Sequence, residues 1–242
     1  MPILVIATRN RHKVQEIKSI LGPGFEYLSL LDLEGAPEPV EDAETFAGNA
    51  LKKAASLAEW LQGRDGFRGQ PREIVENRQF PAPARFVLAD DSGLEVDALG
   101  GAPGVHSARF AALDRTANST DAANCAKLLR LLDGIPDDRR TARFRCAVAL
   151  AGVFPGELKE TESPRIFEGT CEGRILTAPR GSHGFGYDPL FVPEGFSETF
   201  AELGEEIKNG LSHRGQALKK LANEKLPGEH STAQTVIDID KI

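Results

Sequence analysis

Short apolar runs alternate with segments of helical spacing along this chain, the pattern of a mixed α/β protein. Compact runs at Ile3–Ala7, Phe25–Leu30, Phe86–Ala89 and Leu190–Val192 predict strands, and the longer β-rich stretch Thr141–Phe154 predicts a central strand. Strands and helices that alternate in this way predict one sheet with helices packed against it, in two lobes.

Helical spacing predicts four helices between these runs. The first follows the polar turn that ends at Lys13, the second starts at Thr45, and the last follows Ser212. Another is predicted over Thr120–Leu132, with Ser119 or Thr120 as its N-cap.

Two stretches interrupt the pattern. Phe167–Leu176 predicts a pair of strands broken by a hairpin-like turn at Glu172-Gly173. Gly63–Pro83 is polar and lacks a period, and because the core pattern resumes at once, it predicts a loop insertion inside a single domain spanning 1–242. No repeat or separable linker divides the chain.

Composition narrows the function. The 242 residues are 40% apolar, enough to fill one core, and their net charge of −7 argues against a partner such as DNA or RNA polymer. Three cysteines without C-x-x-C spacing suggest neither a disulfide framework nor a zinc site. The N-terminal apolar run is too short for a signal peptide or membrane span, so we expect a cytoplasmic protein without membrane contact.

The stretch Val87–Arg109 carries the first candidate chemistry. Asp90 and Asp91 follow a buried run and precede Ser92-Gly93, which predicts a strand that ends in a turn. Neighbouring strand residues point to opposite sides, so the two acids should have different roles. Carboxylates at a strand end suit Mg²⁺, although acids that only cap backbone N–H groups fit the same pattern.

A second candidate is the polar turn Thr8–Lys13 between the first strand and helix. Backbone N–H groups at a helix start, together with the Lys13 charge, suit a phosphate. A plain helix entry fits equally well, because neither common phosphate-loop motif is present. On the second helix, Asn49 and Lys53 lie four residues apart on one stripe, and spacing leaves open whether that stripe faces solvent or a site.

A third candidate lies in Gly181–Pro189, where three glycines hold two aromatic residues and an acid. Phe185 is suited to stack on a nucleobase, and a tight turn that completes a core is the alternative. Farther along, Lys208, His213 and Arg214 gather cationic groups near a helix start, which suits phosphate or carbonyl recognition or a solvated basic turn.

Taken in order, these motifs resemble the Ham1-like inosine triphosphate pyrophosphatases, a family of non-canonical purine nucleoside triphosphatases. The resemblance extends over nearly the whole chain. Its motifs are T-x-N-x-x-K at Thr8–Lys13, Glu41, T-F-x-x-N-A at Thr45–Ala50, A-D-D-S-G-L at Ala89–Leu94, G-A-P-G-x-x-S-A-R at Gly101–Arg109, F-G-Y-D-P at Phe185–Pro189 and S-H-R-G-Q-A at Ser212–Ala217.

The resemblance implies an α/β fold: an elongated, curved mixed β-sheet with flanking helices and two lobes around a central nucleotide cleft, usually in a homodimer. It also implies Mg²⁺-dependent hydrolysis of ITP, dITP and XTP to the monophosphate and pyrophosphate. Asp91 resembles the general base and a metal-associated carboxylate, with Glu41 as the second acid. The triphosphate would be held by Thr8, Arg9, Asn10, Arg11, His12, Lys13, Lys53 and Ser92, and the nucleoside by Phe185, Gly186, Tyr187, Asp188, Lys208, His213 and Arg214.

Two departures touch this expected site: Gly48 stands where relatives usually have Glu, and His183 where they usually have Gly. Two other functions remain open. A Maf-like pyrophosphatase of different base preference is disfavoured by the F-G-Y-D and S-H-R blocks. A nucleotide-binding module without turnover is disfavoured by the paired acids Glu41 and Asp91, since two carboxylates beside a triphosphate bind poorly without a metal between them.

Overall fold

The computed structural model describes residues 2–38, 40–63, 85–112, 118–153 and 163–224. In this part of the chain a six-stranded sheet has the order β2-β1-β3-β4-β5-β6. β1 pairs in parallel with β2 and β3, and the remaining neighbours pair antiparallel, so the sheet is mixed as predicted. The strands are β1 (Ile3–Ile6), β2 (Glu26–Ser29), β3 (Arg85–Val96), β4 (Thr141–Val153), β5 (Arg165–Ile175) and β6 (Phe191–Pro193).

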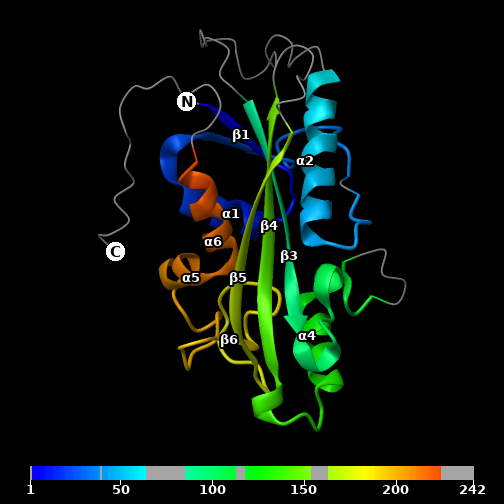
Figure 1. The fold of residues 1–242 in the computed structure, drawn as a ribbon, viewed down its shortest axis with the longest axis vertical. Helices are drawn as coiled ribbons and strands as arrows, with labels where there is room; N and C mark the ends of the chain where they lie inside the picture. The colour runs from blue at the N-terminus through cyan, green and yellow to red at the C-terminus, as the bar shows by residue number, and fades with distance from the viewer. Residues whose placement is uncertain (1, 39, 64–84, 113–117, 154–162, 225–242) are drawn as a thin grey trace.

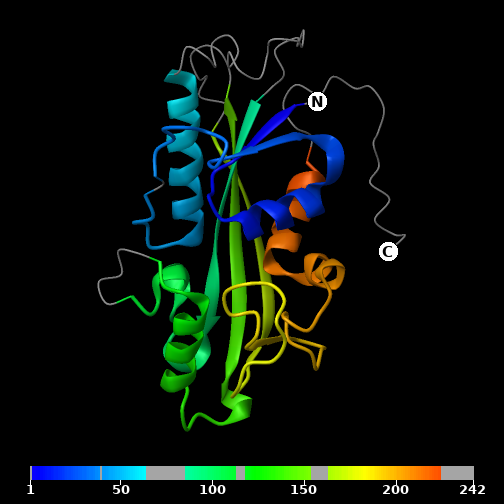
Figure 2. The ribbon, with the colours of Figure 1, turned by 180° about the vertical axis from the view of Figure 1, so that it is seen from behind.

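Helices cover both faces of this curled sheet (Figures 1 and 2). The long helix α2 lies on one side of the strands, and α1 and α6 lie on the other. The helices are α1 (Arg11–Leu21), α2 (Phe46–Gly63), α4 (Asp121–Leu131), α5 (Glu205–Leu211) and α6 (His213–Ala222). Short 3₁₀ turns are η1 (Gly22–Gly24), η2 (Asp97–Leu99), η3 (Gly104–Arg109) and η4 (Asp137–Arg139).

Side chains that cap backbone N–H groups explain where three helices begin. The Asn10 side chain accepts from the N–H groups of His12 and Lys13 at the start of α1. Thr120 caps α4 and Ser212 caps α6 in the same manner. The predicted starts of α4 and α6 are therefore confirmed, whereas α1 begins at Arg11, inside the segment predicted to be a polar turn.

The alternation of side chains along β3 fixes the two sides of the site. Val87 and Ala89 pack in the cluster that includes α2, whereas Phe86 and Leu88 pack in the cluster that includes α1 and α6. Because the period of a strand is two, Asp91 lies on the side of Val87 and Ala89, and Asp90 lies on the opposite side. The predicted division between the adjacent acids is confirmed.

Three long strands join the two halves of the molecule. β3, β4 and β5 run along its longest axis from the half that holds β1, β2 and α2 to the half that holds α4 and β6 (Figure 1). The second half has its own apolar cluster, in which Phe144 of β4 packs against Phe191 and Phe200. The prediction of two lobes that share one sheet fits this arrangement.

Two predicted turns are wrong. Asp90–Gly93 does not end a strand, because β3 continues through it to Val96 and pairs with β4 over its full length. Gly173 likewise lies inside β5, so no hairpin breaks that segment. A Cβ on Gly93 would lie 2.5 Å from Gly104 O and from the Ser107 hydroxyl, and one on Gly173 would collide with β6. Both glycines permit close approach of a neighbouring backbone.

The predicted insertion at 63–83 falls, from residue 64 on, outside the described residues. Among the residues that the structure describes, no helix has both the length and the apolar character needed to cross a lipid bilayer.

Candidate functional site

Asp91, Lys53 and Glu41 form a compact polar cluster between β3 and α2. The Lys53 ammonium donates to Asp91 Oδ1 at 2.9 Å, to Glu41 Oε1 at 2.9 Å and to the Asp90 carbonyl at 2.7 Å. Asn49 Nδ2 donates to Asp91 Oδ2 at 3.1 Å. Both Asn49 and Lys53 are buried, which decides the open question of their stripe: it faces the site.

Arg109 holds Glu41 in place from the other half of the molecule. Its guanidinium, at the end of η3, donates to Glu41 Oε2 at 3.1 Å and to the Glu41 carbonyl at 2.9 Å. One planar fork thus fixes both the side chain and the main chain of the acid. Glu41 lies in the connection before α2, so this contact orients a carboxylate that no regular element holds.

The pKa values of the two acids in this cluster shift in opposite directions. Burial raises the pKa of the Asp91 carboxyl above its usual value, although Lys53 and Lys13 oppose the shift and Glu41 reinforces it. At Glu41 burial also opposes ionisation, but the neighbouring Lys53 charge outweighs it and lowers the pKa. Asp91 is therefore the stronger base of the pair, as a proton acceptor requires.

Asp90, on the other side of β3, is surrounded by donors. Lys13 and Arg214 form ion pairs with it, and Ser92 Oγ and Cys146 Sγ donate to it at 3.2 and 2.9 Å. Burial alone would raise the pKa of Asp90, yet the charges of Arg214 and Lys13 hold it well below its usual range. This carboxylate is a fixed anion with no free role as a base.

A chain of ion pairs continues from Arg214 toward the second half. Arg214 Nη1 donates to Glu16, whose other oxygen accepts from Lys208 Nζ at 2.7 Å. Lys208 also donates to Asp188 Oδ2 at 2.7 Å. All four side chains are buried. With Asp90 and Lys13, the chain holds three acids and three cations, so its formal charges cancel.

Arg214 has little hydrogen-bonding capacity left. Nε donates to Asp90 Oδ2 at 3.1 Å, Nη2 donates to Asp90 Oδ1 at 3.3 Å and to Ser92 Oγ at 2.8 Å, and Nη1 donates to Glu16. A guanidinium has five N–H groups, so one on Nη1 remains for a ligand.

His213, next to Arg214, is a second buried residue with a polar atom left to bind a ligand. Its ring stacks on Phe144 with centroids 4.8 Å apart, and Nδ1 has no hydrogen-bond partner in the described part of the chain. Burial, followed by the Arg214 charge, keeps the pKa of His213 well below its usual value, so the imidazole is neutral at pH 7. A buried nitrogen without a partner suits a polar ligand group.

The glycine-rich turn before β6 is shaped around Asp188. Gly184 has a φ of 74°, and a Cβ there would collide with the Asp188 carboxylate. That carboxylate accepts from the Phe185 N–H at 2.9 Å and from Lys208. Burial raises the pKa of Asp188 against the lowering influence of Lys208. The turn presents the half-buried Phe185 ring beside two cations: Lys208 Nζ is 5.1 Å and Arg214 Cζ 5.8 Å from its centroid.

The next two residues of the turn form hydrogen bonds with other parts of the protein. The Gly186 N–H donates to Asp121 Oδ2 at 2.7 Å, and the buried Tyr187 hydroxyl donates to the Ser107 carbonyl at 2.9 Å. Gly186 and Tyr187 therefore attach the turn to α4 and η3.

In the turn at the start of α1, some residues contact the site and others contact the rest of the protein. Asn10 uses its side chain as the helix cap, so the N–H groups of His12 and Lys13 are already paired. Arg9 binds the segment after β2 through the carbonyls of Leu30 and Ala36. Thr8 Oγ1 accepts from the Asn10 N–H at 3.1 Å, and Arg11 is exposed. Lys13, beside Asp90, is the cation of this turn that the structure places in the site.

The structure thus brings together most of the predicted residues and adds others. The residues joined by the ion pairs and hydrogen bonds above include Glu41, Lys53, Asp91, Ser92, Lys13, Arg214, Lys208 and Asp188. Glu16, Cys146 and Arg109 were not among the predicted site residues. Glu16 carried a usable signal, because it is an acid beside Ile17 on the buried side of α1. Arg109 is the last residue of the motif at Gly101–Arg109 but was given no role, and Cys146 carried no signal.

Both departures from the motifs are accommodated locally. A Cβ on Gly48 would lie 2.9 Å from Ala43 Cβ, so the backbone before α2 is closely packed around this glycine. The His183 N–H donates to the Ala201 carbonyl at 3.1 Å.

The paired acids suit a hard divalent cation. Glu41 and Asp91 each direct one oxygen at the same ammonium, so their carboxylates converge on a positive group. No three His, Cys, Asp or Glu side chains among the described residues lie close enough together to hold a metal alone. Mg²⁺ needs only one or two protein carboxylates, because water and substrate phosphate complete its shell. The donor set fits that ion.

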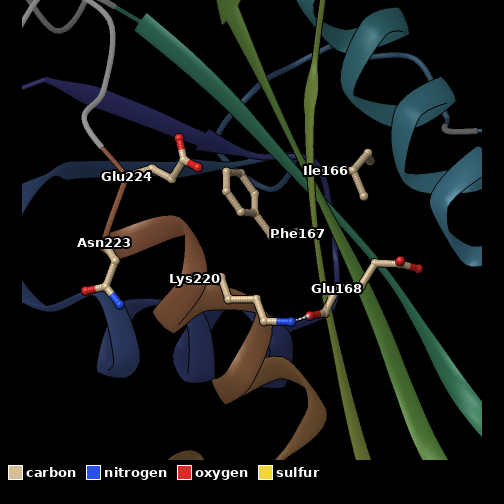
Figure 3. Close-up of a pocket in the computed structure, with 6 residues that line it drawn as sticks. All are labelled: Ile166, Phe167, Glu168, Lys220, Asn223 and Glu224. Carbon is tan, nitrogen blue, oxygen red and sulfur yellow. Dashed lines mark hydrogen bonds between the residues drawn. The ribbon is translucent and has the colours of Figure 1, made fainter.

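A separate hollow of about 570 Å³ lies between β5 and α6 (Figure 3). Lys220 Nζ donates to the Glu168 carbonyl across it at 2.7 Å. The lining residues are Ile166, Phe167, Glu168, Lys220, Asn223 and Glu224. None of them belongs to the polar network described above.

The fold and the site together define the class of protein. It is an α/β protein with a curled mixed sheet, and Asp91 of its strand β3 forms a cluster with Lys53 and Glu41. The chain belongs to the Ham1 family, whose model matches residues 4–224.

Curated relatives and solved structures agree. The chain is 48% identical to a protein named dITP/XTP pyrophosphatase from Desulforamulus reducens, over 90% of this chain and 92% of the relative. It is 46% identical to one of the same name from Geobacillus kaustophilus, over 91% and 93%. The Ham1 protein of Staphylococcus aureus superposes with a TM-score of 0.68 at 31% identity, covering 91% of this chain and 96% of that one.

Proposed function

We propose that this protein hydrolyses non-canonical purine nucleoside triphosphates, dITP, XTP and ITP, to the monophosphate and pyrophosphate. The observation that carries the proposal is the pairing of Asp91, an acid with a raised pKa, with Lys53 and the second acid Glu41 on one face of β3. The names of the relatives at 46–48% identity, dITP/XTP pyrophosphatase, support dITP and XTP as substrates.

Asp91 acts as the base in this proposal. Each of its oxygens accepts one hydrogen bond, from Lys53 or Asn49, and a carboxylate oxygen has capacity for two. Asp91 can therefore take a proton from a water molecule while both partners hold its orientation. Phosphoryl chemistry needs mainly positioning and charge stabilisation, so no nucleophilic Ser or Cys is required.

Glu41 and Asp91 would hold Mg²⁺, which when bound neutralises the phosphates and supports charge moving to the leaving pyrophosphate. Lys13 adds a cation on the other side of β3, where 17% of its side chain is exposed. Lys53 has three acceptors already, so its main role is to keep the two acids together.

The base would lie near Phe185, His213 and Arg214. The unpaired His213 Nδ1 and the remaining Arg214 N–H give polar groups that can meet the 6-oxo group of hypoxanthine or xanthine. A 6-amino group would place a donor where an acceptor is needed. One such mismatch costs about 1–3 kcal/mol, or roughly tenfold to a hundredfold in selectivity.

The decisive test is pyrophosphate release from ITP, dITP, XTP and ATP by metal-free protein, before and after Mg²⁺ is added back. We expect release from the first three substrates, dependent on Mg²⁺, with ATP a poor substrate. The Glu41→Gln variant should need more Mg²⁺ to reach half its maximal rate. Lys52→Met, at an exposed lysine that pairs with Asp42 beside Glu41, is the control and should need as much Mg²⁺ as wild type. Preference for a pyrimidine or modified base, or binding without release, would overturn the proposal.

The proposal includes a homodimer in the cytoplasm, where free nucleotides are the substrates. Sedimentation of the purified chain tests the dimer directly.

A further inference from the structure

The rings of His12 and Phe185 stack on each other, although 172 residues lie between them in the chain. Their centroids are 5.4 Å apart and their planes differ by 17°. His12 lies in the first turn of α1, whereas Phe185 lies in the glycine-rich turn before β6. The stack joins the segment expected at the triphosphate to the segment expected at the base.

The backbone of His12 is fixed while its ring is exposed. Its N–H donates to the Asn10 side chain at 2.9 Å as part of the helix cap. The next residue, Lys13, turns toward Asp90. Adjacent side chains therefore point to different places, Lys13 into the charge network and His12 toward Phe185.

We propose that His12 and Phe185 form the two walls of a slot that takes the purine ring, so that His12 reads the base rather than the triphosphate. This inference rests on the proposed function and names a further base-binding residue for it. Two ring faces enclosing a base lie ~7 Å apart, twice the optimal carbon–carbon separation. An entering base therefore separates the two rings by roughly 2 Å, which rotation of the exposed His12 side chain supplies.

Charge around the slot matches this role. Lys208 Nζ and Arg214 Cζ lie 5.1 and 5.8 Å from the Phe185 centroid, so the slot is bordered by cations. Those cations are tied to Glu16, Asp188 and Asp90, and their positions are fixed. The movable wall is His12.

The test separates the two ends of the nucleotide by titrating inosine and pyrophosphate individually into the full chain, by calorimetry. The variants form a matched pair: His12→Phe keeps an aromatic ring without nitrogens, and His12→Gln keeps polarity without a ring. We expect H12Q to weaken inosine binding roughly five- to a hundredfold, the size of one lost base–aromatic stack, and to leave pyrophosphate binding as in wild type. H12F should bind inosine within about twofold of wild type.

Three results would overturn the slot. If both variants bind pyrophosphate more weakly and bind inosine as wild type does, His12 contacts the phosphates and not the base. Tighter inosine binding by H12Q means that the ring blocks the base site. Inosine and pyrophosphate binding both unchanged in H12Q means that the stack is a surface contact. Failure of the proposed function is a different result, namely no pyrophosphate release from any purine triphosphate by the wild-type protein.

Discussion

Asp90 and Asp91 are neighbours in sequence but lie in opposite electrostatic settings on the two faces of β3. Asp90 has 1% of its side chain exposed and is paired with both Lys13 and Arg214. Asp91 keeps 8% exposure and has Lys53 as its ion partner, with the acid Glu41 nearby. The pKa of Asp90 is lowered, which keeps it ionised, and the pKa of Asp91 is raised, which favours its protonation. One strand thereby supplies an anchor for cations on one face and, on the other, the carboxylate proposed as the base.

The difference shows how adjacent residues of the same type acquire separate roles. An acid saturated by donors positions its partners, and here it fixes Lys13 and Arg214. An acid that keeps acceptor capacity and an elevated pKa can accept a proton. The account therefore predicts that substitutions on the two faces fail in different ways.

The largest expected effect is on turnover in Asp91→Asn. The change removes the base at nearly constant shape, so kcat should fall by roughly 10²–10⁴-fold, the usual worth of a general base. Pyrophosphate release under saturating ITP and Mg²⁺ measures it. The thermal unfolding midpoint should stay near that of wild type, and wild-type turnover in a folded D91N would remove Asp91 from the mechanism.

Asp90→Asn should instead act on stability. Removing the Asp90 charge leaves Lys13 without its ion partner and Arg214 with Glu16 alone, and breaking a buried pair costs about 3–5 kcal/mol. Because the folded-state pKa of Asp90 is depressed, its contribution is present above its unfolded pKa and is lost as pH falls through the folded pKa. Urea unfolding at pH 7 and in acid measures both effects. Equal stability of D90N and wild type at pH 7 would contradict the anchor role.

Selectivity should change by a smaller factor. His213→Phe keeps the stack on Phe144 but removes the ring nitrogens. The ratio of kcat/KM for ITP over ATP should fall by about tenfold to a hundredfold, the size of one lost hydrogen-bond discrimination. Arg214→Lys, which keeps the charge, is the companion variant. If both nucleotides lost activity by the same factor, His213 would be structural and selectivity would reside elsewhere in the turn around Phe185.

The smallest change is a displacement of the pH profile in Lys53→Met. Lys53 lowers the pKa of Asp91, so its removal should move the acidic limb of kcat/KM to higher pH. Lys52→Met is the matched control, because Lys52 is the residue next to Lys53 on α2 and pairs with the exposed Asp42 instead of Asp91. An acidic limb that stayed in place in K53M, or that moved equally in K52M, would separate Lys53 from the titrating base.

Much of this arrangement could be predicted from local pattern. The strand runs, the cap at Thr120, the helix after Ser212 and the opposite directions of adjacent acids all follow from spacing and side-chain chemistry, whereas the cap at Asn10 was not predicted. The resemblance of the ordered motifs pointed to the Ham1 family, which the comparisons confirm.

The errors have one physical cause. Gly93 and Gly173 look like turn residues, yet each lies in a strand where another backbone approaches too closely for a Cβ. Such contacts join segments distant in sequence, and local propensity contains no information about them. For the same reason no role was predicted for Arg109 or Cys146, because their contacts with Glu41 and Asp90 depend on how the whole sheet is assembled.

The pKa values of the two neighbouring carboxyls are expected to lie on opposite sides of the usual aspartate value. Carbon-detected NMR of ¹³C-labelled, metal-free protein measures both, with each resonance assigned through its loss in D90N or D91N. We expect Asp91 to titrate above ~3.9, the ordinary aspartate pKa, and Asp90 to remain ionised to well below it. The reverse order, or two carboxyls that titrate together at the ordinary value, would contradict it.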